Sequence, residues 1–449
     1  EDTARRNIKG AALFGDDAAT WVTLFVEHGP SESMSIGDLQ DLVRRHWARG
    51  MRLLEEDWTA AEEDHDRFIL RLAQLAGLKS EGDKGGGPGH GHSPVTFTPR
   101  AVPVRLPIGP VSRRVDNDEA VTFPVNGAGN SPHIAIMGSL GTGKTRVART
   151  MMAEAHRQSG CPVIVFDPKG DLSEDKAFVE SIGATVVSLP KMPVPLDILH
   201  AGTGTKEARG AMSMRFRESF ARVPTSRLGD VQTALVGEAV DLALAGRSPV
   251  TLSQVQDRVK ELYAARKRRE DIVTTTFADM TRLTLFDPKL SPAEFFSRSW
   301  VIDLHSQFLS DSARRLVSFL IFDAAAMYLL SQPDSDVDAE FNRALRLMLV
   351  VDEARKVLEY EQESFIDLIR ASRSKGGVVM TISQSPDDFV GQNENFLENI
   401  GLGVVLRTNA KANTVAAMLG ASPDLSGLEN GVCYTRLGKE PATRVRTWG

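Results

Sequence analysis

The feature that most constrains this chain is a glycine-rich run, Gly138-Ser-Leu-Gly-Thr-Gly-Lys-Thr145. It follows an apolar stretch, 133–137, with the composition of a buried strand, and it precedes residues 146–156, which have a helical pattern. A strand, a glycine-rich loop and a helix in this order form a P-loop, whose backbone N–H groups surround phosphate oxygens at the positive end of the helix. The run therefore predicts a nucleotide site on an α/β fold.

Residues of this loop have expected roles in holding the nucleotide. We expect Lys144 to reach the terminal phosphates and the Thr145 hydroxyl to ligate Mg²⁺. The residues expected to contact the nucleotide are Gly138, Ser139, Gly141, Thr142, Gly143, Lys144, Thr145 and Arg146.

The composition is ordinary for a soluble globular protein and leaves room for several domains. Of its 449 residues, 42% are apolar and 25% are charged. The two cysteines, Cys161 and Cys433, lie in apolar strand-like runs, so we expect buried thiols and a cytoplasmic location. The longest apolar stretch, 316–330, is too short to span a bilayer and contains Asp323, so it predicts a core helix and no membrane association. The net charge of −6 gives no global attraction to nucleic acid, so any such contact depends on local patches.

Residues 1–79 are expected to form a small, all-helical N-terminal domain. Helix-like patterns occupy 18–27, 35–54 and 60–75. These patterns fit a domain that packs only its own core, and they also fit a module that binds DNA or a partner protein. Residues 80–94 are rich in glycine and cannot bury enough apolar surface to fold, so they predict a flexible linker.

Residues 95–449 are expected to form the nucleotide-binding domain, with a helical insertion at about 204–298. No strand pattern occurs in the insertion, whereas Thr251 and Gln254 form a capping box that predicts the start of a helix. Continuous apolar runs are typical of strands covered by helices on both faces, so they predict a doubly wound, mostly parallel sheet. These runs are 133–137, 162–167, 185–189, 300–304, 345–352, 377–383 and 403–407. Segments broken by prolines predict edge strands at 95–98, 102–106 and 120–124.

A second chemical motif lies at the end of the run 345–351, where Asp352 and Glu353 follow the apolar residues. This is a Walker B pattern, in which Asp352 is expected to hold Mg²⁺ and Glu353 to act as general base on the attacking water. The run 377–383 ends in Gln384, whose amide can both donate and accept at the γ-phosphate if its strand lies between the other two. A polar residue that merely closes a strand is the alternative for Gln384.

These motifs together resemble the HerA/FtsK superfamily of DNA-pumping ATPases. The resemblance is carried by the P-loop, the Val-Phe-Asp-Pro-Lys-Gly run 165–170, and the runs 350–353, 381–384, 404–408, 419–420 and 429–431. It covers most of residues 100–449 apart from the helical insertion. The resemblance implies a RecA-like fold, ATP and Mg²⁺ as cofactors, and a homo-oligomeric ring, expected to be a hexamer, that threads duplex DNA. The HAS-barrel domain usual before a HerA motor is not evident.

The same resemblance implies catalytic roles for individual residues. Glu353 corresponds to the Walker B glutamate and Gln384 to the strand-end glutamine. Arg373 resembles the arginine finger that a neighbouring subunit supplies in this family. Rivals for that role are Arg370 and Arg407. Asp167 matches an acidic strand end of the family, without an assigned step.

Residues 47–57, Trp-Ala-Arg-Gly-Met-Arg-Leu-Leu-Glu-Glu-Asp, resemble the end of DndE, a small helical protein of bacterial DNA phosphorothioation systems. This resemblance implies a motor that works with other DNA-modification or defence proteins against foreign DNA.

The sequence therefore predicts an ATPase that moves along or remodels DNA. A secretion or conjugation ATPase of the VirB4/TraG type has the same motifs and is the first alternative. A nucleotide-gated platform, in which ATP holds a ring around a partner effector, is the second.

Overall fold

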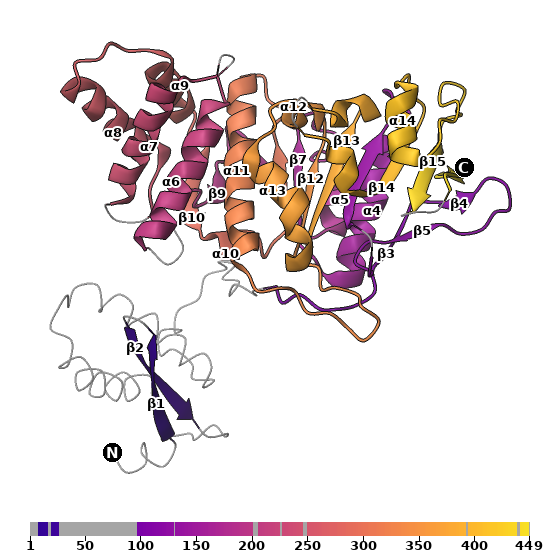
Figure 1. Ribbon diagram of the computed structural model, residues 1–449, viewed down its shortest axis with the longest axis horizontal. Coiled ribbons are helices and arrows are strands. Elements are labelled where there is room, and N and C mark those ends of the chain that lie inside the picture. The colour runs from indigo at the N-terminus through magenta and orange to yellow at the C-terminus, as the bar shows by residue number, and fades with distance from the viewer. Residues whose placement is uncertain are drawn as a thin grey trace, which may run out of the picture. The chain divides into compact units, whose positions relative to one another are not determined.

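The computed structural model describes residues 8–16, 19–26, 97–129, 131–200, 205–224, 227–245, 249–391, 394–437 and 441–448 (Figure 1). The chain divides into two compact units, residues 1–92 and 93–449. Within the described residues, no helix is both long enough and apolar enough to cross a membrane.

In the first unit, β1 (Ile8–Asp16) and β2 (Ala19–Val26) form an antiparallel pair. The helix predicted at 18–27 is therefore wrong, and so is the prediction that the N-terminal domain is all-helical. The sequence of β2 is Ala-Thr-Trp-Val-Thr-Leu-Phe-Val, and its β-branched and aromatic residues favour a strand over a helix. The predicted helices at 35–54 and 60–75, and the predicted linker at 80–94, lie outside the described residues.

The second unit is built on a ten-stranded sheet whose strands from β14 to β8 are all parallel. In spatial order the strands are β4 (Arg113–Arg114), β16 (Thr443–Arg446), β15 (Val432–Leu437), β14 (Ile400–Val405), β6 (His133–Met137), β13 (Gly377–Ser383), β12 (Leu347–Val351), β7 (Val163–Asp167), β11 (Trp300–Asp303) and β8 (Thr185–Ser188). Every continuous apolar run of the sequence supplies one of the parallel strands. The predicted mostly parallel sheet is confirmed.

The proline-broken segments behave differently from the prediction. β3 (Arg105–Pro107) and β5 (Thr122–Pro124) pair with each other in a separate two-stranded sheet, while residues 97–98 are not in a strand. Only the short β4 joins the edge of the main sheet, through β16. Proline lacks the N–H that continued pairing requires, which keeps these segments short.

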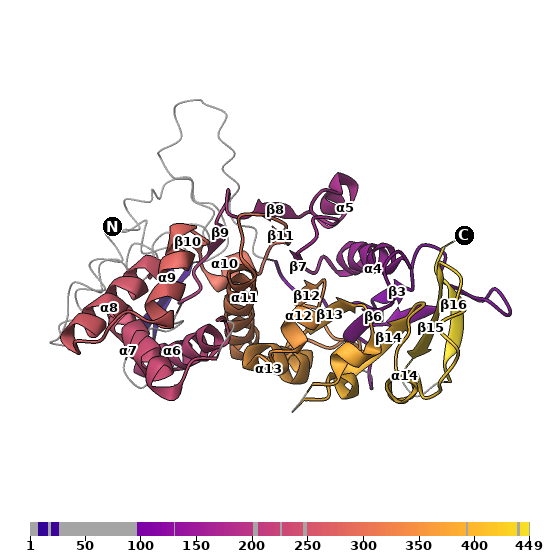
Figure 2. The ribbon, with the colours of Figure 1, turned by 90° about the horizontal axis from the view of Figure 1, so that it is seen from above.

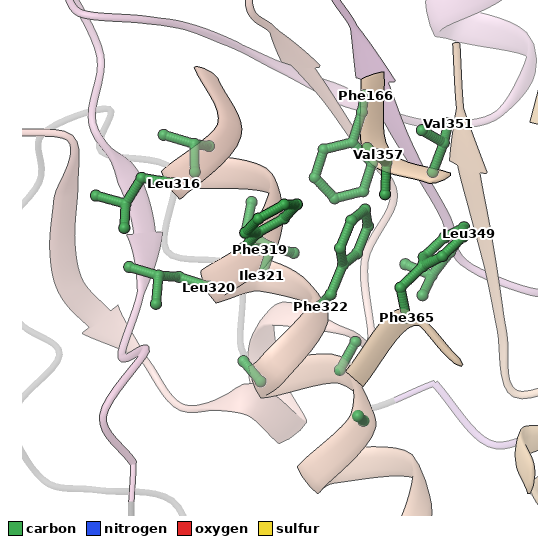
Figure 3. Packing of buried hydrophobic residues seen from close by; sticks show 14 of the residues in the cluster. Phe166, Leu316, Phe319, Leu320, Ile321, Phe322, Leu349, Val351, Val357 and Phe365 are labelled. Carbon is green, nitrogen blue, oxygen red and sulfur yellow. The ribbon is translucent and has the colours of Figure 1, made fainter. Parts of the chain in front are cut away.

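Helices cover both faces of the sheet, and each face has its own core. α4 (Lys144–Ser159) and α5 (Lys176–Ser181) lie on one side, and Figure 2 shows α13 (Glu363–Ala371) and α14 (Ala412–Leu419) on the other. The longest helix, α11 (Asp311–Ser331), is the predicted core helix and packs against α13. Its Phe322 ring lies 4.9 Å from that of Phe166 and 5.0 Å from that of Phe365 (Figure 3).

The region of the predicted insertion contains α6 (Lys206–Ala221), α7 (Asp230–Leu244), α8 (Leu252–Ala265), α9 (Ile272–Arg282) and the short α10 (Pro292–Phe295). Thr251 and Gln254 form the predicted capping box at the start of α8. The region also contains a strand that the sequence pattern missed. β10 (Phe286–Leu290) pairs in parallel with β9 (Val194–Leu196), and its Asp287, Pro288 and Lys289 break the apolar run that predicts a strand.

A buried carboxyl group in α11 leads to a prediction about stability. Asp323 is 1% exposed, and its Oδ1 accepts hydrogen bonds from Gln362 Nε2 at 2.8 Å and from Ser364 Oγ at 2.6 Å. Burial raises the pKa of Asp323 from 3.8 to about 6, against the opposing effect of these hydrogen bonds. The folded protein therefore keeps a proton that the unfolded chain has lost, so the free energy of unfolding falls as pH rises from about 4 to about 6.

Asp323→Asn keeps the acceptor oxygen without the charge. We expect the free energy of unfolding of this variant not to fall between about pH 4 and about pH 6. At about pH 8 the variant should be more stable than the parent, by up to about 3 kcal/mol. Denaturant unfolding of both proteins at about pH 5 and about pH 8 measures the effect. An equal pH dependence in parent and variant would contradict the assignment.

Candidate active site

The P-loop connects β6 to α4 and turns on glycines. Gly141 and Gly143 have φ angles of 76° and 101°, in the left-handed region that side chains other than glycine rarely adopt. Lys144 is buried, and its Nζ donates hydrogen bonds to the carbonyl oxygens of Gly138 at 2.6 Å and Ser139 at 2.9 Å. Burial, with the nearby charge of Lys169, lowers the pKa of Lys144. The cation expected to meet the phosphates thus lies within the loop itself.

The last described residue packs directly on this loop. The Trp448 ring lies against Gly143, where a Cβ atom would overlap it, so both φ and contact require glycine. The guanidinium carbon of the exposed Arg146 lies 5.3 Å from the centre of the Trp448 ring. Nothing in the sequence pattern predicts this contact, because it joins residues about 300 positions apart.

The Walker B residues follow β12 at the same edge of the sheet. Asp352 Oδ1 accepts a hydrogen bond from the N–H of Glu353 at 2.8 Å. Asp352 Oδ2 is buried without a hydrogen-bond partner among the described residues. Burial raises the pKa of Asp352, and the charge of Lys169 opposes this effect. Glu353 has a φ of 51°, a strained value for a residue with a side chain and one that is common at functional sites.

Gln384 reaches Glu353 from the neighbouring strand. β13 lies between β6 and β12, as the proposed role of Gln384 requires. Gln384 Nε2 donates a hydrogen bond to Glu353 Oε2 at 3.4 Å. The structure therefore brings Lys144, Glu353 and Gln384 to one edge, from the ends of three adjacent strands.

A further cation, to which the sequence assigns no role, completes this group. Lys169 forms an ion pair with Glu353 Oε1, and its Nζ lies 3.8 Å from Asp352 Oδ2. Burial alone would raise the pKa of Glu353, but the hydrogen bond and charge of Lys169 hold it below its ordinary value. The pKa of Lys169 is raised, because its pairing with Glu353 and Asp352 outweighs its burial.

Asp167, which had no assigned step, shapes the loop that carries Lys169. Its buried carboxylate accepts hydrogen bonds from four backbone N–H groups of that loop. The donors are Lys169, Gly170, Leu172 and Ser173, at 2.8 to 3.3 Å. Asp167 therefore acts on the site through the backbone.

The residues present fit a magnesium nucleotide. Among the described residues no group of three or more His, Cys, Asp or Glu side chains could hold a metal alone. Mg²⁺ does not need such a group, because it keeps several waters and is commonly held by one or two protein oxygens together with phosphates. The partnerless Oδ2 of Asp352 and the Thr145 hydroxyl, at the start of α4, are the oxygens available for it.

The three candidate finger arginines lie in different places. Arg373 is in the short 3₁₀ helix Ser372–Lys375, at the opposite edge of the sheet, on the order of 20 Å from the P-loop across β13. Its side chain is exposed and forms no hydrogen bond or ion pair with the residues that the structure describes. Arg370 pairs with Glu394 at 2.5 Å. Arg407 lies beside the P-loop of its own chain, where its carbonyl oxygen accepts the N–H of Ser139 at 2.8 Å.

Parts of this chain are similar to known proteins in sequence and in fold. The model of the central domain of the helicase HerA matches residues 111–281. The DNA import protein CedB of Sulfolobus acidocaldarius is 23% identical over 302 residues, which are 65% of this chain and 46% of CedB. The chain thus spans about half the length of that curated relative. VirB4 of Thermoanaerobacter pseudethanolicus has the same fold, with a TM-score of 0.58 at 16% identity, over 76% of this chain and 95% of VirB4.

Proposed function

Because the chain carries a HerA-type P-loop ATPase domain, we propose that it hydrolyses ATP with Mg²⁺ and uses the energy to move or remodel DNA. One observation carries the hydrolytic part of the proposal. Lys144, Glu353 and Gln384 converge at the carboxyl edge of adjacent parallel strands, where ligands bind in open α/β sheets. A regulator that only binds nucleotide needs the lysine but has no use for a base and an amide beside it.

Each residue of the site has a defined task in this reaction. Lys144 binds the terminal phosphates, and Asp352 with Thr145 would hold the metal ion, which would neutralise charge on the phosphates. Glu353 accepts a proton from the attacking water at a carboxylate oxygen. The Gln384 amide lies next to Glu353 and orients the water or the γ-phosphate.

We further propose that the active unit is a ring of identical subunits, six by family resemblance. The Arg373 side chain has no hydrogen-bond or ion-pair partner among the described residues of its own chain, and Arg373 lies a strand's length from its own P-loop. An arginine so placed can reach a nucleotide only in another subunit. The contact is head-to-tail, since one edge of the sheet meets the opposite edge of the next copy, and such contacts form a ring when the rotation between neighbouring subunits closes. Native mass spectrometry with a non-hydrolysable ATP analogue tests the subunit number.

DNA is the proposed substrate of the motor. CedB, a DNA import protein by name, supports this choice. The net charge of −6 is compatible with it, because a few Lys or Arg side chains facing the pore are repeated around a ring.

We expect duplex DNA to raise the rate of ATP hydrolysis severalfold, with a stimulation that weakens as salt rises. Turnover measured with duplex DNA, single-stranded DNA and no DNA, at two salt concentrations, checks this. Stimulation by single strands alone would favour the VirB4/TraG alternative. A rate that no nucleic acid changes would contradict DNA movement and favour the nucleotide-gated platform.

A narrower proposal concerns partners. The likeness of residues 47–57 to DndE supports a role beside DNA-modification or defence proteins, and these residues lie outside the described part of the chain. Co-purification of the intact chain with phosphorothioation proteins, compared with a chain lacking residues 1–92, tests this association.

A further inference from the structure

We propose that Lys169 is a placeholder cation, which neutralises Asp352 and Glu353 in the nucleotide-free protein and gives up these contacts when a magnesium nucleotide binds. The proposal rests on the proposed ATPase function and adds a positioning residue to it. Nucleotide binding thereby breaks the contact between Lys169 and Glu353, and Glu353 can then act as a base.

The placement of the Lys169 side chain supports this role. Its ammonium group bridges the two acidic residues, paired with Glu353 Oε1 and 3.8 Å from Asp352 Oδ2. The carboxylates are poorly hydrated, since the side chain of Asp352 is 1% exposed and that of Glu353 is 16% exposed. Two adjacent carboxylates with so little water are costly to keep charged without a cation.

Hydrogen bonds fix the backbone of the loop that carries Lys169. The four N–H donors to Asp167 include the amide of Lys169 itself, at 3.3 Å. The next residue, Gly170, has a φ of 85° and lies against His305, where a Cβ atom would contact the imidazole ring. Asp167 and Gly170 together give the loop a shape that directs Lys169 towards β12.

The same contacts also restrain the base. Glu353 Oε1 is paired with Lys169 and Glu353 Oε2 accepts the hydrogen bond of Gln384, so each oxygen of the carboxylate has a partner. The nearest cation to the otherwise partnerless Asp352 Oδ2 is again Lys169. An ammonium group and a divalent ion at this one oxygen repel each other. The Lys169 ammonium group must therefore move away from Asp352 when Asp352 becomes a metal ligand.

The opposite role for Lys169 is a second phosphate-binding lysine. The two roles predict opposite effects on binding when Lys169 is removed. Removal of a placeholder makes the metal easier to bind, whereas removal of a phosphate ligand makes the nucleotide harder to bind. This difference allows a test that does not depend on the rate of hydrolysis.

The test is the Mg²⁺ dependence of binding of a fluorescent, non-hydrolysable ATP analogue to the full chain. We expect Lys169→Met to reach half-saturation at roughly tenfold lower Mg²⁺ than the parent, because one competing charge is gone. Lys169→Arg keeps the charge and should retain the parent's Mg²⁺ requirement. Lys176→Met, an exposed lysine seven residues further along the chain, is the matched control and should also behave as the parent. Weaker or unchanged binding by Lys169→Met would overturn the proposal.

A second measurement separates the placeholder from general damage to the loop. Without nucleotide, Lys169→Met should unfold at a lower temperature than the parent, and saturating Mg²⁺ with the analogue should reduce that difference. In Glu353→Gln, where one of the two charges is absent, the Lys169→Met change should shift the Mg²⁺ midpoint by a smaller factor. An equal shift in both backgrounds would contradict the linkage to Glu353. Failure of the parent itself to bind the analogue would count against the proposed ATPase function. If the parent binds normally, an unexpected result for Lys169→Met counts against the placeholder role alone.

Discussion

Arg373→Ala is expected to bind ATP as tightly as the parent and to hydrolyse it roughly 10³- to 10⁵-fold more slowly, the range over which arginine fingers act. The reason is its position. Arg373 lies at the edge of the sheet opposite its own P-loop, so its guanidinium can stabilise transition-state charge only in a neighbouring subunit. The alternative is a structural arginine paired with a carboxylate nearby in the sequence, such as Glu363 or Asp367. Glu363 pairs with Arg222 instead, and Asp367 pairs with Arg215.

Mixing experiments test the trans arrangement directly. Arg373→Ala retains an intact pocket and Lys144→Ala retains an intact finger, so the two inactive proteins should regain activity together in mixed rings. Arg370→Ala is the matched control. Its loss removes an exposed ion pair with Glu394 and should change turnover by less than about tenfold. Mixed oligomers that exchange subunits without any recovery would rule out Arg373 as the finger.

Glu353→Gln is expected to slow hydrolysis by roughly 10²-fold or more while nucleotide binding persists. Glutamine keeps the size of the side chain and its hydrogen bond with Gln384, but it cannot take a proton from water. Single-turnover hydrolysis and analogue binding, measured on the same protein, separate the two effects. Glu359→Gln, an exposed glutamate on the same segment, provides the control and should hydrolyse ATP at the parent rate. Undiminished hydrolysis by Glu353→Gln would remove this residue from the mechanism.

The local sequence pattern was sufficient to predict most strands of the main sheet. The continuous apolar runs that became β6, β7, β12 and β13 are buried along their whole length, and short runs of this composition are typical of strands covered on both faces. The P-loop and the Asp352-Glu353 pair were recognisable for a related reason. Their chemistry depends on residue types at fixed spacing beside a strand, and spacing is visible in the sequence.

The local sequence pattern gave wrong predictions where the composition did not clearly indicate a strand. β10 contains Asp287, Pro288 and Lys289, and its pairing with β9 outweighs their low preference for strands. β2 was predicted as a helix because its apolar residues fit both periods, although its threonines, valines and aromatic residues favour a strand.

The sequence by itself determined which groups the proposed chemistry can use, namely a glycine-rich loop with a lysine, an Asp-Glu pair and an amide, because these follow from residue identity. Only the tertiary structure decided how they meet. The order β6, β13, β12, β7 brings Gln384 to Glu353 and brings Lys169 to the same carboxylate. The Trp448 ring contacts Gly143, although the two residues are far apart in the sequence. Contacts of this kind depend on strand order and on packing between distant segments, and these arise from the burial of the complete core rather than from any local stretch of residues.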